Sequence, residues 1–193
     1  MGKRRRRVNS QELPPKVYLF SEDAVTAPIY LRSLFRSKSN VKLELVLGGA
    51  VPTTLFAGAK MKQATLPQAN DKVWLIFDRD DHPRVDEVVN ECLGIDIVLG
   101  YSNPCFELWL LYHYQDHHAP DDRQQVKAKL SDVCSDYCAK AHKLADVADL
   151  LPRLEDAVRR AKASLVSREE QGAPYGRPCS TMAAIIESLN EFS

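Results

Sequence analysis

The segment KVWLIFDRDD, residues Lys72–Asp81, decides the fold class of this 193-residue chain. Its continuous apolar run, Val73–Phe77, predicts a strand that is buried on both faces, as strands of parallel sheets are. Acidic residues follow the run at once, at Asp78, Asp80 and Asp81. Ligands of α/β sheets bind beyond the carboxyl ends of the strands, so we expect a binding site here.

Strand and helix patterns alternate on both sides of this segment. Strands are predicted at Lys16–Phe20, Val41–Leu47, Lys72–Phe77 and Ile95–Leu99. Helices are predicted at Thr26–Phe35, at Thr53–Ala64 with Thr53 or Thr54 as its cap, and at Arg84–Leu93. This alternation indicates an α/β fold, with a mainly parallel sheet that is flanked by helices.

The pattern becomes helical in the second half of the chain. Helices are predicted at Phe106–Tyr114, Asp122–Leu130, Leu144–Leu165 and Thr181–Phe192. We therefore expect a basic flexible tail over residues 1–15, an α/β core over 16–104, and a mainly helical part packed on the core over 105–193.

Composition narrows the class of protein. Hydrophobic residues make up 45% of the chain, and no apolar run approaches the roughly 20 residues of a membrane span, so a cytoplasmic location is expected. Net charge is zero, but the run Lys3–Arg7 is basic; it either binds phosphates or only aids solubility. The five cysteines lack CxxC spacing and are expected to be reduced thiols, and His117-His118 resembles a solvated loop.

The acidic segment has two interpretations. Asp78 and Asp80 point the same way along an extended chain, with Cα atoms about 6.5 Å apart, and a divalent cation would relieve their repulsion. The alternative is an Asp-rich solvated turn that Arg79 and Arg84 neutralise. Glu22 favours the metal site, because it ends the first strand as Asp78 ends the third. If the two strands are neighbours, Glu22 or Asp23 faces the same crevice.

A third element, Ser102–Trp109, follows the fourth predicted strand. Ser102 or Asn103 is a candidate helix cap. Glu107 stands alone in an apolar helix, so it is either a site residue or the partner of a buried arginine. His113 lies six residues further on, faces away from Glu107, and is interpreted as a core or surface histidine.

Taken together, these motifs resemble the RloB-like family. The resemblance runs from about Val17 to Leu189 and includes the Pro178–Thr181 segment before the last helix. It implies a Toprim-like fold and a metal-dependent nuclease, similar to those of the OLD and abortive-infection type. It also implies a role in prokaryotic anti-phage defence, often beside an ATPase of the ABC/AAA kind. RNA such as tRNA, or DNA, is the expected substrate, and an oligomer is possible.

The resemblance also implies roles for individual residues. Catalysis is expected from Glu22, Asp78 and Asp80, with Glu107 as an accessory acid. Mg²⁺ or Mn²⁺ is expected at Glu22, Asp78, Asp80 and Asp81. Independently of the resemblance, the positive charges of Arg79, Arg84, Lys3, Arg4 and Arg5 make these residues candidates for contact with the phosphates of a nucleic acid.

The first acidic motif departs from the family pattern. The family usually has Glu-Gly-Glu-Lys-Thr-Glu-Pro, whereas this chain has Glu22-Asp23-Ala24-Val25-Thr26-Ala27-Pro28. Asp23 replaces a glycine that would allow close backbone approach to a ligand. The alternative function is therefore a weakened or inactive Toprim-like binding subunit of a defence ATPase complex.

Overall fold

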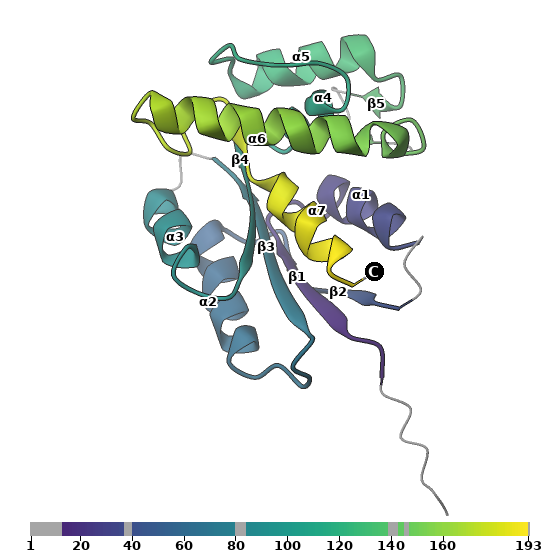
Figure 1. Cartoon of the computed structure of the whole chain (residues 1–193), viewed down its shortest axis with the longest axis vertical. Helices are drawn as coiled ribbons and strands as arrows, with labels where there is room; N and C mark the ends of the chain where they lie inside the picture. The colour runs from purple at the N-terminus through teal and green to yellow at the C-terminus, as the bar shows by residue number, and fades with distance from the viewer. Residues whose placement is uncertain (1–12, 37–39, 80–83, 139–142, 145–146, 193) are drawn as a thin grey trace, which may run out of the picture.

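The computed structural model describes residues 13–36, 40–79, 84–138, 143–144 and 147–192. Its main element is a five-stranded sheet of order β2-β1-β3-β4-β7 (Figure 1). The strands are β1 (Lys16–Ser21), β2 (Lys42–Gly48), β3 (Lys72–Asp78), β4 (Val98–Asn103) and β7 (Cys179–Ser180). The first four are parallel and β7 is antiparallel to β4, so the predicted α/β class is confirmed.

Helices cover both faces of this sheet. One face packs against α2 (Pro52–Gln63) and α3 (Val85–Cys92), and the other against α1 (Thr26–Phe35) and α7 (Met182–Asn190). Side chains of β3 divide between the faces, with Trp74 and Ile76 in one core and Val73, Leu75 and Phe77 in the other. The continuous apolar run of β3 is thus explained by burial on both sides.

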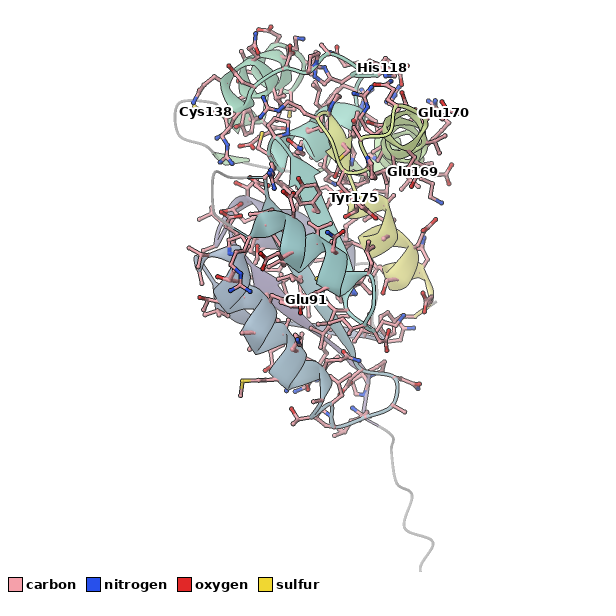
Figure 2. All side chains as sticks on the ribbon, turned by 90° about the vertical axis from the view of Figure 1, so that its left-hand side faces the viewer. Glu91, His118, Cys138, Glu169, Glu170 and Tyr175 are labelled. Atoms are coloured by element: carbon pink, nitrogen blue, oxygen red, sulfur yellow. The ribbon has the colours of Figure 1, made fainter. Side chains whose placement is uncertain are left out.

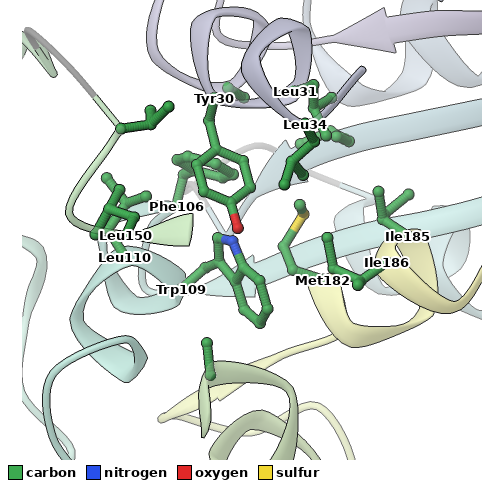
Figure 3. Close-up of a cluster of buried hydrophobic side chains, with 14 of the residues drawn as sticks. Tyr30, Leu31, Leu34, Phe106, Trp109, Leu110, Leu150, Met182, Ile185 and Ile186 are labelled. Atoms are coloured by element: carbon green, nitrogen blue, oxygen red, sulfur yellow. The ribbon is translucent and has the colours of Figure 1, made fainter. Parts of the chain in front are cut away.

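Trp109 lies in the larger core, where the helical part meets the sheet (Figure 3). The side chains around it come from α1 and α7, and include Tyr30, Leu31, Leu34, Met182, Ile185 and Ile186. Close packing explains Gly100 in β4, because a Cβ there would lie 2.8 Å from Met182 Sδ and 2.9 Å from Ile76 Cγ1. Only glycine lets α7 approach the sheet this closely.

The second half of the chain is mainly helical. It contains α4 (Glu107–Tyr112), α5 (Arg123–Val133), the 3-10 helix η1 (Leu151–Arg153), α6 (Leu154–Glu170), and the short strands β5 (Tyr137–Cys138) and β6 (Lys143–Leu144). Figure 1 shows α4, α5 and α6 at the end of the sheet toward which the parallel strands point. In the part of the chain that the structure describes, no helix is long and apolar enough to cross a membrane.

Predicted helix boundaries differ from the observed ones most clearly at α2, α5 and α6, and α5 extends to Val133 rather than Leu130. Neither Thr53 nor Thr54 caps α2, because Val51 is the cap and Pro52 opens the helix. The helix predicted over Leu144–Leu165 is instead η1 followed by α6, which extends to Glu170. Here Pro152 lies in the 3-10 turn that precedes α6.

The predicted fourth strand, Ile95–Leu99, begins and ends too early in the sequence. It runs over Val98–Asn103, so Ser102 and Asn103 belong to the sheet and cap no helix. The short strand β7, which the sequence did not predict, pairs with this end, and the hydroxyls of Ser102 and Ser180 lie 3.1 Å apart. Two residues are too few to show the alternating pattern of a strand.

The histidine pair at 117–118 divides between core and surface. His117 is buried, which lowers its pKa, and its Nε2 lies 3.6 Å from Asp121 Oδ2. The expectation of a solvated loop is therefore wrong for His117, while His118 is exposed. The five cysteines carry free thiols, and all except Cys138 are buried.

Candidate functional site

Glu22 and Asp78 meet at the carboxyl edge of the sheet. β1 and β3 are adjacent, with Ser21 opposite Ile76, and the Glu22 amide donates to the Ile76 carbonyl at 2.9 Å. The Asp78 amide in turn donates to Glu22 Oε2 at 2.9 Å. The two strands are therefore neighbours, which is the condition that the sequence interpretation required. The backbone of one acidic residue positions the carboxylate of the other.

Asp23, at the same edge of the sheet, binds backbone amides at the start of α1. Its carboxylate accepts hydrogen bonds from the amides of Val25, at 2.7 Å, and Ala27, at 2.9 Å. These amides lie at the start of α1, where backbone N–H groups have no partner within the helix. Asp23 therefore fixes the entry into α1, and this accounts for an acid where the family pattern has glycine.

The opposite wall of the site comes from α5. Arg123 Nη2 lies 3.7 Å from Asp78 Oδ2 and donates to the Pro104 carbonyl at 3.5 Å. Lys127 lies four residues further along the helix, on the same face. A capping box formed by Asp122 and Gln125 fixes the first turn of α5. The helix therefore presents two cations to the acidic edge of the sheet.

Glu107 is the third carboxylate of this region and is buried in α4. It accepts a hydrogen bond from the Tyr137 hydroxyl at 2.8 Å and lies 3.5 Å from Lys127 Nζ. Burial and the adjacent carboxylate raise the pKa of Tyr137, so this hydroxyl remains a donor. The alternatives for Glu107 were a site residue or a partner of a buried arginine. The structure gives it a lysine and a tyrosine as partners and places it in the wall of the same site.

His113 does not belong to the site. It is buried in the core, where its Nδ1 lies 3.0 Å from the Trp109 carbonyl and its Nε2 lies 3.0 Å from the Tyr30 hydroxyl. A carbonyl can only accept, so Nδ1 carries the proton and Nε2 accepts from Tyr30. Burial lowers the pKa of His113 to about 4, and the interpretation as a core histidine is confirmed.

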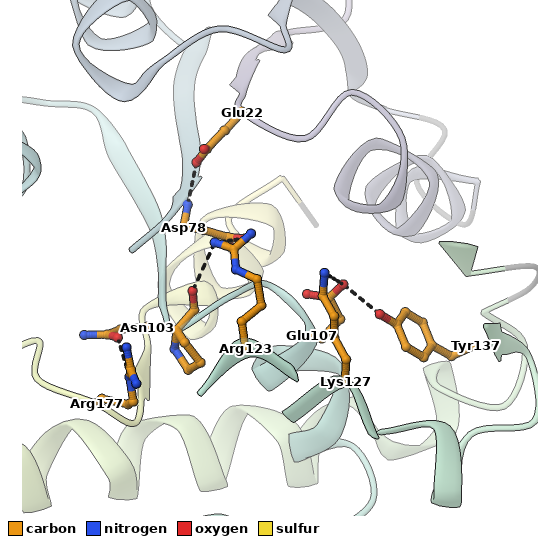
Figure 4. A network of polar contacts seen from close by, with 9 residues as sticks. Glu22, Asp78, Asn103, Glu107, Arg123, Lys127, Tyr137 and Arg177 are labelled. Atoms are coloured by element: carbon orange, nitrogen blue, oxygen red, sulfur yellow. Dashed lines mark hydrogen bonds and ion pairs between the residues drawn. The ribbon is translucent and has the colours of Figure 1, made fainter. Parts of the chain in front are cut away.

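A hollow of about 230 Å³ lies between the acidic edge and the two cations (Figure 4). We call it the acid–base pocket. Its lining consists of Glu22, Asp23, Thr26, Asp78, Phe106, Glu107, Arg123 and Lys127. Sequence reasoning missed Arg123, Lys127 and the supporting Tyr137. The available signal for the two cations was their spacing of four on a polar helix that follows a capping-box pattern.

The cationic residues that were expected at the site from the sequence do not line this pocket, or lie outside the described residues. Arg79 forms a two-pronged ion pair with Asp86 at 2.5 and 3.2 Å, and Arg84 Nε lies 2.6 Å from Glu87 Oε2. Both arginines thus face acids of α3 in this structure. Residues expected to bind metal or phosphate that lie outside the described ranges are Asp80, Asp81, Lys3, Arg4 and Arg5.

The chemistry of the pocket suits a hard cation at its acidic edge. Over the described ranges, no group of three or more His, Cys, Asp or Glu side chains is close enough to hold a metal ion. Glu22 and Asp78 supply two carboxylates, and Mg²⁺ is commonly held by one or two, together with waters and substrate phosphates. The residues present therefore fit a magnesium-type ion that shares its ligands with water or substrate.

These features define an α/β protein with an acid–base pocket at the carboxyl edge of a mainly parallel sheet. The family model described as RloB-like protein matches residues 17–189, and the chain belongs to this family. All residues that line the pocket lie within the match. No curated protein and no solved structure matches the chain.

Proposed function

We propose that this protein is a metal-dependent nuclease that hydrolyses phosphodiester bonds of RNA, such as tRNA, or of DNA. The observation that carries the proposal is the meeting of Glu22 and Asp78 at the sheet edge, opposite Arg123 and Lys127. Membership of the RloB-like family supports it through the Toprim-like fold that the resemblance implies. A role in prokaryotic anti-phage defence, beside an ATPase of the ABC/AAA kind, is part of the proposal.

Glu22 and Asp78 would hold Mg²⁺ or Mn²⁺, and Asp80 and Asp81 remain predicted ligands. When bound, such an ion polarises a phosphoryl oxygen and lowers the pKa of a coordinated water. The Asp78 amide keeps the Glu22 carboxylate at the edge of the sheet, so the two acids are placed before any ligand arrives. Preorganised ligands lower the reorganisation that binding requires.

Arg123 and Lys127 would bind the non-bridging oxygens of the scissile phosphate. The planar guanidinium of arginine matches a phosphate with two parallel hydrogen bonds, whereas a lysine acts as a point charge. At 3.7 Å from Asp78, Arg123 is close enough for attraction but beyond a direct hydrogen bond.

Glu107 would act through Lys127 as a positioning residue. Tyr137 and Lys127 hold its carboxylate in the wall of the pocket, and the attraction keeps the lysine near the acidic edge. Substrate phosphate and Glu107 would then share the lysine. This is a different task from that of Glu22 and Asp78, although all three are carboxylates.

A second candidate function is phosphate binding without cleavage. It is favoured by the ion pairs of Asp78 with Arg123 and of Glu107 with Lys127, which neutralise these two of the four acids in the pocket lining without a metal. The changed first motif, with Ala24 and Ala27 in place of two acids, points the same way. In this case the protein would be a binding subunit of the defence complex.

A cleavage assay separates the two candidates. Purified protein is incubated with labelled RNA and DNA in Mg²⁺ or Mn²⁺, beside the variants Asp78→Asn and Glu22→Gln. Both changes keep the shape and a hydrogen-bonding oxygen and remove the charge. We expect cleavage by the wild type that both variants lose, while the control Asp96→Asn, in the exposed turn that precedes β4, keeps it. Absence of cleavage by the wild type, or equal cleavage by all variants, would contradict the nuclease.

A further inference from the structure

A second hollow, of about 350 Å³, lies at the same edge of the sheet on the face covered by α3. We call it the α3-side hollow. In Figure 2 its residue Tyr175 lies between α3, which carries Glu91, and the end of α6, which carries Glu169 and Glu170. The hollow is also lined by Tyr101 and Asn103 of β4, by Asp86 and Asn90 of α3, and by Arg79, which follows β3.

The α3-side hollow and the acid–base pocket flank the end of the same strand. Asp78 lines the pocket and its neighbour Arg79 lines the hollow, because successive side chains of a strand point to opposite faces. Their Cα atoms are separated by one peptide unit, about 3.8 Å. At the end of β4, Asn103 lines the hollow, and the backbone carbonyl of the next residue, Pro104, accepts from Arg123 of the pocket wall. The hollow and the pocket thus lie on opposite sides of one edge of the sheet.

The loop between α6 and β7 holds Tyr175 in an unfavourable backbone conformation. Its φ of 63° lies in the left-handed region, which side chains with a Cβ rarely adopt. The Asn103 amide fixes the loop by donating to the Tyr175 carbonyl at 3.1 Å. Arg177 Nε in turn donates to Asn103 Oδ1 at 3.4 Å (Figure 4). Conformations of this kind concentrate at ligand sites, where the surrounding structure enforces them.

The planar groups of this hollow suit a flat, polar ring. The Tyr175 ring is half-buried and packs edge-on against Tyr101, with ring centroids 6.3 Å apart at 81°. The Arg79 guanidinium is planar, and its two hydrogen bonds to Asp86 fix its orientation, so it supplies a second planar surface. Asn90, exposed on α3, supplies an amide that can both donate and accept. Aromatic and guanidinium surfaces with nearby amides are the means by which proteins bind unstacked bases.

We propose that the α3-side hollow binds a nucleobase, with Tyr175 as its stacking residue and Asn90 as a polar contact. The base would belong to the nucleotide adjacent to the phosphate held in the acid–base pocket. This inference rests on the proposed function, because it assigns the position of the substrate strand. It makes the hollow the part of the protein that determines which nucleotide lies beside the cut.

Binding of mononucleotides tests the hollow independently of cleavage. AMP, GMP, CMP and UMP are titrated by calorimetry without divalent metal, and ribose 5-phosphate is the control that lacks a base. We expect at least one nucleotide to bind more tightly than ribose 5-phosphate. Tyr175→Ala should weaken that nucleotide about 5- to 100-fold, as stacking on one base does, and leave ribose 5-phosphate unchanged. Tyr175→Phe keeps the ring and should retain the affinity.

Three results would overturn the nucleobase site: equal affinity for all four nucleotides and ribose 5-phosphate, no effect of Tyr175→Ala, or equal losses for Ala and Phe. Asn90→Ala, on the exposed face of a helix, gives a second variant in which folding is not at risk; it should weaken binding, and unchanged affinity removes its role as a polar contact.

Competition with a strand distinguishes a base of nucleic acid from a free nucleotide. A single strand of about ten nucleotides should displace the bound mononucleotide from the wild type; failure to do so overturns the strand assignment. In the cleavage assay, Tyr175→Ala should raise KM while changing kcat little. If the wild type cuts no nucleic acid but still binds nucleotides through Tyr175, the nuclease fails and the base site stands.

Discussion

The acid–base pocket joins two carboxylates that come from different halves of the chain and are held in different ways. Asp78, at the end of β3, lies 3.7 Å from Arg123, and its side chain is 17% exposed. Glu107, in α4, is 8% exposed; it accepts from Tyr137 at 2.8 Å and lies 3.5 Å from Lys127. Asp78, which comes from the sheet, is thus the more exposed acid of the pocket, whereas Glu107, which comes from the helical part, is buried in the pocket wall.

This difference predicts that Asp78 contributes mainly to activity and Glu107 mainly to the stability of the fold. A buried carboxylate with two close partners costs free energy to disturb, because each partner would remain buried without its counter-charge or acceptor. The Asp78 side chain is about twice as exposed as that of Glu107, so a ligand in the pocket reaches it more readily. We therefore expect substitutions of Asp78 to affect activity more than stability, and substitutions of Glu107 to do the reverse.

The largest expected effect is on the cleavage rate of Asp78→Asn. Loss of a metal ligand should lower the rate at least about 100-fold, since the metal supplies several kcal/mol of transition-state stabilisation. The free energy of unfolding should change by less than about 1 kcal/mol, as for a partly exposed ion pair. Rates from the cleavage assay and urea unfolding of the same preparations check both parts. A variant that loses more than this in stability would make Asp78 an architectural residue.

Glu107→Ala should give the largest loss of stability. It removes the carboxylate that Lys127 and the Tyr137 hydroxyl contact in the buried wall, which should cost about 3 kcal/mol in the free energy of unfolding. A compensating pair, Glu107→Leu with Lys127→Met, should recover most of that loss because no charge remains buried. Urea titration provides the measurement. Equal instability of the double and single variants would show that volume, not charge, governs this wall.

Acid should destabilise the helix that carries Glu107, through His113. The pKa of His113 is about 4 in the folded protein and 6.5 in the unfolded chain, so unfolding binds a proton between these values. Its contribution to stability is complete above pH 6.5 and falls with pH, by about 2 kcal/mol between roughly pH 7 and pH 5. His113→Gln should be less stable at neutral pH and show a shallower slope. An equal slope in the variant would assign the acid sensitivity to other groups.

The smallest effect is expected at the start of α5. Asp122→Ala removes the capping box that fixes the turn carrying Arg123, which should cost about 1 kcal/mol. Asp122→Asn keeps a capping oxygen and serves as the matched control. Thermal unfolding followed by circular dichroism measures both. If Ala and Asn behave alike, the cap does not stabilise this wall of the pocket.

The sheet half was predictable because its signals are local. The apolar run of β3 and the turn residues around it located Asp78, and the matching position after β1 located Glu22. Whether the two strands are neighbours stayed a condition, because the sequence does not give the strand order; the structure shows that β1 and β3 are adjacent. Arg123, Lys127 and Tyr137 could not be found in this way, since their role depends on how the helical part packs over the sheet edge. Arg79 was expected to contact phosphate because of its charge and its place beside Asp78. In the structure it forms an ion pair with Asp86, which the sequence does not reveal.

The short strand β7 and the loop before it show the same limit. Two residues pair with β4 across almost 80 positions of sequence, and Thr181 then completes the edge by donating to the Leu99 carbonyl at 2.6 Å. Nothing in a two-residue segment distinguishes a strand from a turn. Residues 174–176 of the loop before β7 line the α3-side hollow, and the pairing of β7 with β4 places that loop. The hollow therefore also cannot be predicted from the sequence.

Titration with Mn²⁺ tests the central claim most directly, namely that Glu22 and Asp78 form a metal site. Binding is followed by calorimetry for the wild type, Asp78→Asn, Glu22→Gln and the surface control Asp96→Asn, each with and without nucleic acid. We predict binding by the wild type and the control, with loss of that binding in both pocket variants. Wild-type protein that binds no Mn²⁺ even with nucleic acid present, or pocket variants that bind it as well as the wild type, would contradict the claim.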